Sequence, residues 1–245
     1  MKAPRNHQLL FPLFFITLIQ LSSFAQTEDA LLVNSQAFEI DAYKDIEGNP
    51  YYFAEWQLGK VYPKDHTAKD DKFEEYLMNY NGHSKSFEIR KDKRFIALDE
   101  QYYDKIEIQL MEGEELKTIT FKNNAHPNMS NRFMRVVFEG TNFEVIQDYQ
   151  VRLSQREKQA YGKKEMIDFF TKSPNYYLVE NNTAQTVKLK KKHLLSLFKN
   201  QESAIKKFAK KNGMKLNSEK DLIALLGYYE SLTQAKSTLA DSGRE

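Results

Sequence analysis

Apolar and polar residues alternate along most of the chain between residues 51 and 190. An alternation with a period of two places apolar side chains on one face of a strand and polar side chains on the other. The alternation is clearest in seven stretches: Trp56, Leu58 and Val61; Phe87 and Ile89; Ile96 and Leu98; Ile106, Ile108 and Leu110; Ile119 and Phe121; Met134, Val136 and Phe138; and Phe143 onward to Leu153. The region is also rich in Tyr and Phe, which favour strands, so we predict about nine short strands.

Turn-forming residues separate these stretches. Asn81-Gly82 is a strong signal for a two-residue hairpin turn, because both residue types tolerate a positive φ. Further reversals are expected at Glu112-Gly113, at residues 140–142 and at Asn181-Asn182. No helix-length segment lies between the strands, so we expect an antiparallel meander and no parallel βαβ units. About nine strands are more than a flat open sheet accommodates well, so we expect the sheet to be curled or partly closed.

The pattern changes to a helical period after about residue 190. The spacing of apolar residues predicts helices at 191–199 and 201–212. Ser218 is a suitable N-cap for a further helix, with Glu219 in its positively polarised first turn. We therefore predict an α+β fold, in which a mainly antiparallel sheet is followed by a helical hairpin that packs on it.

The first 25 residues have the three parts of a cleavable secretory signal peptide. Lys2 and Arg5 form a positive start, and residues 9–21 are an apolar run too short to span a bilayer comfortably. Ser23 and Ala25 then place small residues at the −3 and −1 positions of a cleavage site. We expect an exported protein, periplasmic or extracellular, whose working chain begins near Gln26.

The expected organisation follows from these patterns. Residues 27–38 are interpreted as a short helix or a loosely held segment, and residues 48–50 as a turn. The predicted parts are the signal peptide at 1–25, an N-terminal leader at 26–50, the antiparallel β domain at 51–190, the helical segment at 191–235 and a disordered tail at 236–245.

The remaining composition narrows the class of protein. No stretch after the signal peptide approaches 18 apolar residues, so we expect no transmembrane span after cleavage. The chain contains no cysteine, which excludes disulfide bonds, thiolate chemistry and lipidation of an N-terminal cysteine.

Charge is distributed unevenly along the chain. Removing Lys2 and Arg5 with the signal peptide changes the formal net charge from +2 to zero. Residues 188–215 nevertheless contain ten lysines and one acid, Glu202, so this block carries +9 and the rest of the mature chain −9. On a helix, most of these lysines fall opposite the apolar residues, as on any solvated helix face.

The basic block is also a candidate contact for an anionic surface. The candidate residues are Lys206, Lys207, Lys210 and Lys211, and the candidate partners are an anionic membrane surface or an envelope protein. The block lacks arginines and stacking aromatics, and the chain is expected to be exported, so we expect no nucleic-acid partner.

Three stretches carry a resemblance to known proteins: residues 191–232, the strand at Tyr176-Tyr177-Leu178, and the run WQLGKV at residues 56–61. In these, the chain resembles a group of uncharacterised exported β-rich proteins of Gram-negative bacteria with a lysine-rich C-terminal helical segment. The resemblance implies export and this domain layout. It carries over no activity and no functional residue.

The chain shows no catalytic or cofactor motif. The mature histidines, His66, His83, His126 and His193, are too far apart in sequence for a paired metal-ligand motif. Nucleophile elbows and phosphate-binding glycine loops are also missing from the sequence. We therefore assign no catalytic residue, metal ligand or cofactor site.

Three hypotheses about function follow. The first is a non-enzymatic envelope or periplasmic protein that acts by binding or structural interaction. The second is a carrier that holds a lipid or other apolar ligand between sheet and helices, which needs a contiguous apolar cavity there. The third is a hydrolase with two carboxylates converging in one cleft at roughly 5 to 10 Å.

Overall fold

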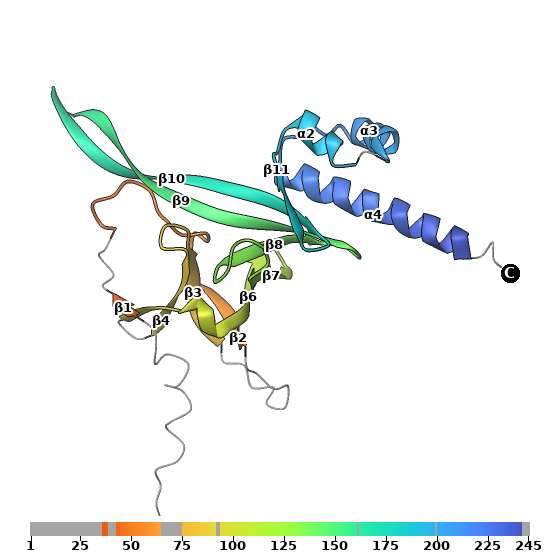
Figure 1. Ribbon diagram of the computed structural model, residues 1–245. Helices are drawn as coiled ribbons and strands as arrows, with labels where there is room; N and C mark the ends of the chain where they lie inside the picture. The colour runs from red at the N-terminus through yellow and green to blue at the C-terminus, as the bar shows by residue number, and fades with distance from the viewer. Residues whose placement is uncertain are drawn as a thin grey trace, which may run out of the picture. The chain divides into compact units, whose positions relative to one another are not determined.

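The computed structural model describes residues 36–38, 43–64, 75–91, 94–160, 162–198 and 200–241 (Figure 1). The expected signal peptide at 1–25 and the start of the leader lie outside the described residues, as do His66 and Lys199. The described residues have the predicted α+β architecture, with an antiparallel sheet followed by C-terminal helices.

Within the described ranges, eleven strands form one sheet, and all neighbouring strands are antiparallel. The strands are β1 (Gln36–Phe38), β2 (Gln57–Pro63), β3 (Glu75–Asn81), β4 (Ser86–Lys91), β5 (Arg94–Ala97), β6 (Tyr103–Glu112), β7 (Glu115–Asn123), β8 (Phe133–Glu139), β9 (Phe143–Ala160), β10 (Lys163–Glu180) and β11 (Thr183–Val187). Their order is β1-β5-β4-β3-β2-β6-β7-β8-β9-β10-β11, so β2 lies between β3 and β6. A short 3-10 helix, η1 (Glu100–Tyr102), leads from β5 to β6.

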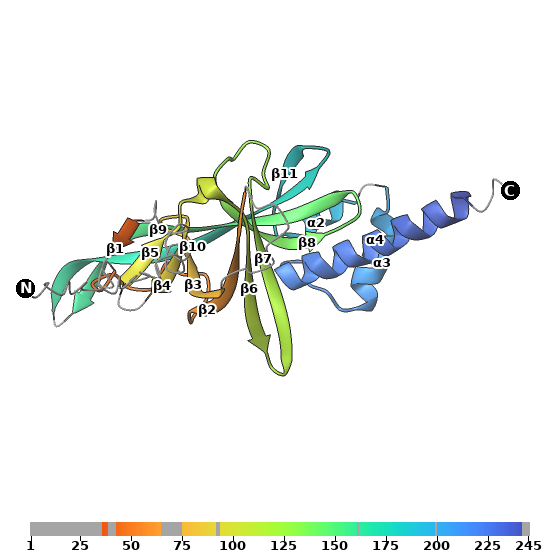
Figure 2. The same ribbon diagram turned by 90° about the horizontal axis from the view of Figure 1, so that it is seen from below.

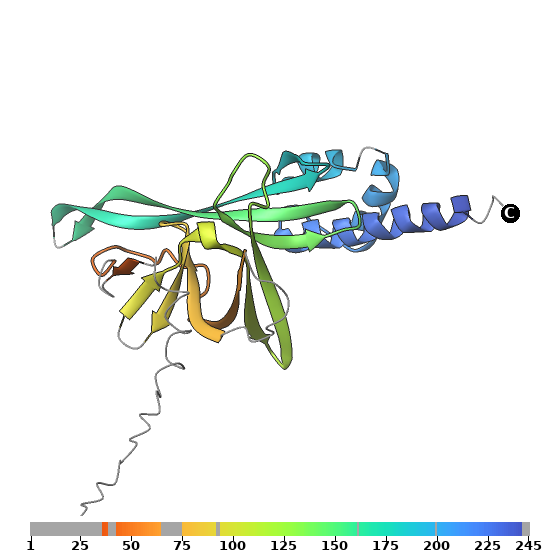
Figure 3. The ribbon, with the colours of Figure 1, turned by 60° about the horizontal axis from the view of Figure 1, so that its bottom comes forward.

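The sheet curls until the β3–β4 loop contacts β9. The main-chain N–H of Val151 on β9 donates to the carbonyl oxygen of Gly82 at 2.9 Å, although four strands separate β3 from β9 in the sheet order. Figure 3 shows β9 and β10 crossing above the curve formed by β2 to β7. The enclosed space is filled by aromatic side chains. Phe87, for example, lies 4.9 Å from Phe121 and 5.4 Å from Phe133 between ring centroids, and all three are fully buried.

Residues 50–53 pack along β3. The Tyr52 N–H donates to the Tyr80 carbonyl at 2.9 Å. The buried Asn79 side chain accepts from the Phe53 N–H at 3.1 Å and donates to the Phe53 carbonyl at 3.0 Å, which replaces a pair of strand hydrogen bonds. Since both main-chain groups of Phe53 are satisfied by one amide, this irregular segment can be buried.

The longest strands, β9 and β10, pair over their full 18 residues. On its other side, β10 pairs with β11 only from Tyr176 to Glu180. Further along the same edge, the Phe170 N–H and the Asp168 carbonyl bond to Glu47. The N–H and C=O groups of even-numbered residues of β10, such as Asp168 and Phe170, therefore point toward this edge and away from β9. Pro174 belongs to that series, and proline has no N–H to leave unpaired there.

The Asn81-Gly82 turn was predicted at the right place but with the wrong geometry. Asn81 pairs with Ser86, so four residues form the loop, and the positive φ of +66° is at Lys85. Gly82 is needed for close approach instead. A Cβ there would lie 2.7 Å from the Tyr149 ring and 2.8 Å from Val151. The Asn181-Asn182 reversal is confirmed, with positive φ at both residues.

The structure differs from the prediction at four places. Residues 36–38 form strand β1, paired with β5, where a short helix or loose segment was expected. Strands β3 and the first half of β10 were not predicted. The last helix continues to Asp241, inside the expected tail at 236–245, because neither glycine nor proline occurs between Gly227 and Gly243; residues 242–245 lie outside the described part.

The helices are α2 (Lys191–Ser196), α3 (Glu202–Lys211) and α4 (Glu219–Asp241). They pack together and against the end of the sheet formed by β8 to β11 (Figure 2). The buried residues of this contact include Val145 and Tyr176 from the sheet, and Leu194, Ile205 and Leu225 from the helices. Within the described residues, no helix is both long and apolar enough to cross a membrane.

We expect two glycine-to-alanine substitutions to change stability in opposite directions. Gly82→Ala forces a methyl group against Tyr149 and Val151 and lowers the free energy of unfolding by about 2 kcal/mol. Gly227 is exposed in α4, and a methyl group added there would have one neighbouring atom within 4 Å, at 4.0 Å, so Gly227→Ala raises the free energy of unfolding by about 0.5–1 kcal/mol. Urea unfolding monitored by circular dichroism measures both. A neutral Gly82→Ala would contradict the close contact between the β3–β4 loop and β9.

Candidate functional site: the lysine-rich helices

Helix α3 carries the predicted candidate lysines on one side. Ile205 and Ala209 are buried at 0% and 4% exposure and face the core. Lys206, Lys207, Lys210 and Lys211 are all exposed. The helical period therefore separates the two sets as the sequence predicted. We call these four residues the lysine face.

The lysine face is weakly neutralised within the chain. Lys206 forms an ion pair with Glu202 at 2.6 Å, one turn earlier on the same helix. Among the described residues, the other three have no acidic partner within ion-pair distance. Lys210 and Lys211 lie in the last turn of α3, where the helix dipole favours cations, so part of their role is local stabilisation. Further exposed lysines precede and begin α2, at positions 188 and 190–192.

A row of polar residues on the sheet holds the start of α4. Arg135 on β8 lies opposite Gln147 on β9, and Gln147 lies opposite Tyr176 on β10. All three bond to one oxygen of Glu219, Oε2, in the first turn of α4. The Tyr176 hydroxyl donates to it at 2.9 Å, the Gln147 amide donates at 3.1 Å, and Arg135 forms an ion pair with it.

The cluster is largely buried, and its burial changes the acidity of Tyr176. Gln147 and Tyr176 are 5% and 7% exposed. Burial and the neighbouring Glu219 carboxylate raise the pKa of the Tyr176 hydroxyl to about 12, so it stays a donor. Ser218 caps the helix by accepting from the Asp221 N–H at 3.2 Å, as expected from its position. We call the contact of Glu219 with Arg135, Gln147 and Tyr176 the Glu219 clamp.

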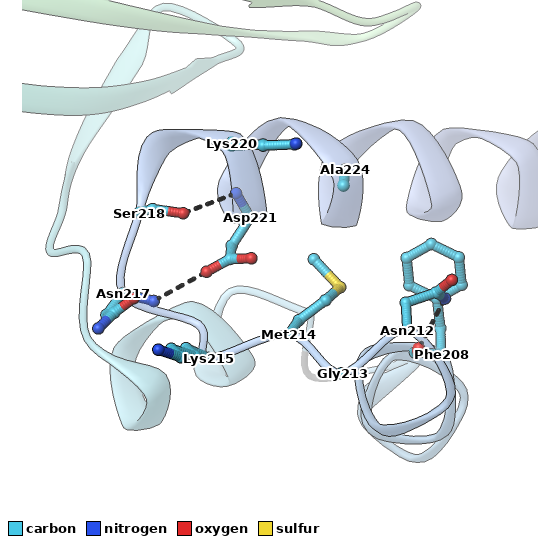
Figure 4. A pocket seen from close by; sticks show the side chains of 10 residues that line it. All are labelled: Phe208, Asn212, Gly213, Met214, Lys215, Asn217, Ser218, Lys220, Asp221 and Ala224. Atoms are coloured by element: carbon cyan, nitrogen blue, oxygen red, sulfur yellow. Dashed lines mark hydrogen bonds between the residues drawn. The ribbon is translucent and has the colours of Figure 1, made fainter.

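Two surface pockets lie on the helices. The first, of about 460 Å³, lies between the end of α3 and the start of α4 (Figure 4). Phe208, Met214 and Ala224 contribute its apolar lining, and Lys215, Lys220 and Asp221 its charges. The second, of about 740 Å³, is lined by residues 200–204, Lys206, Lys207 and Tyr228. The Phe208 and Tyr228 rings, stacked at 4.2 Å, contribute one ring to each pocket.

Ionisable groups are also buried inside the curled sheet, where the sequence did not single them out. Asp148 is fully buried and pairs with Arg132 at 2.9 Å through Oδ2. Its Oδ1 and the buried Tyr80 hydroxyl have no hydrogen-bond partner among the described residues. Glu100 lies in η1 and is half-buried, and this burial raises the pKa of its carboxyl to about 7. Neither helical pocket includes these residues.

A second buried carboxyl anchors the segment before β2. Glu88, 2% exposed, accepts from the Tyr51 hydroxyl at 2.7 Å and from the Asn81 amide at 2.6 Å. Burial raises the pKa of its carboxyl despite these two donors. Glu88 therefore has a structural role, because its bond to Tyr51 holds the segment before β2 against β3 and β4.

The histidines lie in separate environments. His83 lies near Phe170, His126 packs on Tyr177 at 4.7 Å between ring centroids, and His193 contacts the Thr186 carbonyl at 2.9 Å. Over the ranges that the structure describes, no group of three His, Cys, Asp or Glu side chains is arranged to hold a metal ion.

Comparison with known proteins adds no family. No protein-family model, no curated protein sequence and no solved structure matches the chain.

We expect two tyrosine-to-phenylalanine substitutions to distinguish a bonded hydroxyl from an unbonded one. Tyr176→Phe removes a hydrogen bond to a carboxylate and lowers the free energy of unfolding by about 1–2 kcal/mol. Tyr80→Phe removes a buried hydroxyl that has no partner among the described residues, and changes stability by less than about 0.5 kcal/mol or increases it. Both are measured by urea unfolding. Equal losses in the two variants would contradict the hydrogen-bond assignment.

Glu100 provides a test with pH. Its folded-state pKa of about 7 lies above the ordinary value of 4.5, so the folded state holds a proton that the unfolded state releases between these values. This group therefore makes the fold less stable as pH rises from about 4.5 to 7, on the order of 1 kcal/mol after allowance for solvent screening. Glu100→Gln removes this loss and is more stable than wild type at pH 8. Parallel unfolding curves of the two proteins from pH 5 to 8 are the measurement, and a constant difference between them would contradict it.

Proposed function

We propose that the chain is an exported, non-enzymatic interaction protein that docks on an anionic membrane surface through its lysine face. The observation that carries the proposal is the arrangement of α3. Four exposed lysines project from a helix whose other side is buried, and three of them lack an acidic partner among the described residues.

The magnitude of such docking is modest. A lysine near an anionic lipid surface contributes about 1 kcal/mol, and the attraction decays over a Debye length of about 10 Å at 0.1 M salt. Four lysines then supply a few kcal/mol, enough for reversible, salt-sensitive binding. The Glu219 clamp supports the proposal because it fixes the helices to the sheet, so the lysines act together.

Export rests on the signal-peptide pattern at residues 1–25, and the resemblance to exported β-rich proteins agrees with it. The same face could serve an acidic envelope protein, and the experiment below separates the two by using vesicles that contain no protein.

The carrier hypothesis has less support. It needs a contiguous apolar cavity between sheet and helices, but side chains such as Val145, Leu194 and Leu225 fill that space. The two pockets have mixed linings and open at the helical surface.

The hydrolase hypothesis needs two carboxylates in one cleft, and each of the two helical pockets contains a single acidic residue, Asp221 or Glu202.

We expect the mature chain to co-sediment with vesicles of phosphatidylcholine and phosphatidylglycerol at low salt, and not with pure phosphatidylcholine. Reversing Lys206, Lys207, Lys210 and Lys211 to glutamate weakens binding by more than about tenfold, because attraction becomes repulsion. Raising the salt concentration weakens wild-type binding in the same direction.

A matched control reverses four exposed lysines elsewhere, at Lys44, Lys117, Lys163 and Lys164. It makes the same change in net charge but leaves the lysine face intact, so it retains most of the binding. Equal losses in both variants would show a general charge effect, and no binding by wild type would exclude membrane docking.

A further inference from the structure

The hairpin formed by β6 and β7 exposes two apolar side chains at its end. Met111 and Leu116 are cross-strand partners and are 62% and 59% exposed. Paired residues project from the same face of the ribbon, so the two form one apolar patch. An exposed apolar patch on a projecting hairpin is a common form of contact site.

The same tip concentrates negative charge. Glu112 and Glu115 are also cross-strand partners, and Glu114 lies in the turn between them. Like charges directly opposite each other destabilise a hairpin. Lys117 pairs with Glu112, which leaves Glu114 and Glu115 without an ion pair among the described residues. We call residues 111–116 the acidic tip, because its one face is apolar and its other face and turn are acidic.

The pocket between α3 and α4 has the complementary character. Figure 4 shows Met214 and Asp221 pointing into the space beneath α4, with Lys215 and Lys220 at its edges. Its apolar lining comes from Phe208, Met214 and Ala224, and its charged residues sum to +1. Lys210 and Lys211 precede it on α3. The Asp221 carboxylate accepts from the Asn217 N–H at 3.2 Å within the same chain, and the lining as a whole is apolar with a net positive charge, which fits a tip with an apolar face and an acidic end.

We propose that the acidic tip of one copy of the chain docks in the α3–α4 pocket of a second copy. The two surfaces belong to the same sequence, so every copy brings both, in a mature chain whose net charge of zero divides into a +9 block and a −9 remainder. The tip and the pocket are different patches, so the contact is head-to-tail and can add further copies. One hairpin end in one pocket is a small contact, and contacts below roughly 1,000 Å² give weak, reversible association.

This inference does not depend on membrane docking. The acidic tip lies on β6 and β7, away from the lysine face of α3 in the sequence. A substitution at the tip can therefore remove self-association while vesicle binding is retained, and the two proposals can fail separately.

The missing cysteines make the contact directly testable. One sample carries Glu114→Cys and a second carries Ala224→Cys, an exposed lining residue of the pocket. A disulfide forms only when the two Cα atoms come within about 7 Å, so mixing the samples under mild oxidation reports the docked geometry. We expect the mixed heterodimer to form several-fold faster than with the control partner Lys163→Cys, whose site is also exposed.

Two further conditions sharpen the test. Adding Met111→Ser and Leu116→Ser to the Glu114→Cys chain removes the apolar patch and should reduce cross-linking to the control rate. High salt should slow it as well. Sedimentation velocity on the unmodified chain should show a sedimentation coefficient that rises with concentration at low salt, with the rise lost in the double serine variant.

Cross-linking no faster than the Lys163→Cys control, or cross-linking unchanged by the two serines, would overturn the proposal. A sedimentation coefficient independent of concentration at low salt would do the same. If the double serine variant also lost vesicle binding, the tip would be part of the membrane contact and not a separate docking element.

Discussion

The arrangement of the helices on the sheet depends on one carboxylate. Glu219 receives three donors from three adjacent strands, and Arg135, Gln147 and Tyr176 form a single row across β8, β9 and β10. Because side chains alternate between faces along a strand, a shift of register by one residue would turn one member of this row to the opposite face. The docking of α4 through Glu219 therefore requires the correct register of β8, β9 and β10. Removal of any donor would leave a partly buried charge with fewer partners, which is costly.

The lysine face is held in place because the helices are attached to the sheet. Lysines on a freely moving helix would be an ordinary solvated surface, whereas on α3 they are held over a core that includes Ile205 and Leu225. The curl of the sheet is achieved by different means. There, a glycine at position 82 and an amide at Asn79 permit close main-chain contacts, and aromatic rings fill the enclosed volume.

The fold class could be predicted because most strands alternate in the expected way, but two strands do not. On β3, Asn79 and Asn81 are buried and satisfied by hydrogen bonds, while Leu77 is 42% exposed, so its polarity pattern contradicts its burial. The first half of β10 is exposed or half-buried on both faces, and Pro174 follows it in the second half, so neither the pattern nor the composition of this segment indicates a strand. The lysine face was predictable from helical spacing alone. The Glu219 clamp was not, because it joins residues 135, 147, 176 and 219, which only the tertiary fold brings together.

Pro174 has a consequence for the protein at high concentration. Among the described residues, no strand pairs with the edge of β10 between the Glu47 contact and β11, and an open edge of this kind is where a foreign strand can add and where fibre growth can begin. A proline at the middle of that gap removes the donor that an incoming strand would need. Another residue at position 174 would restore this donor on the edge of β10 that faces away from β9, and the edge would lose one of its protections against ordered aggregation.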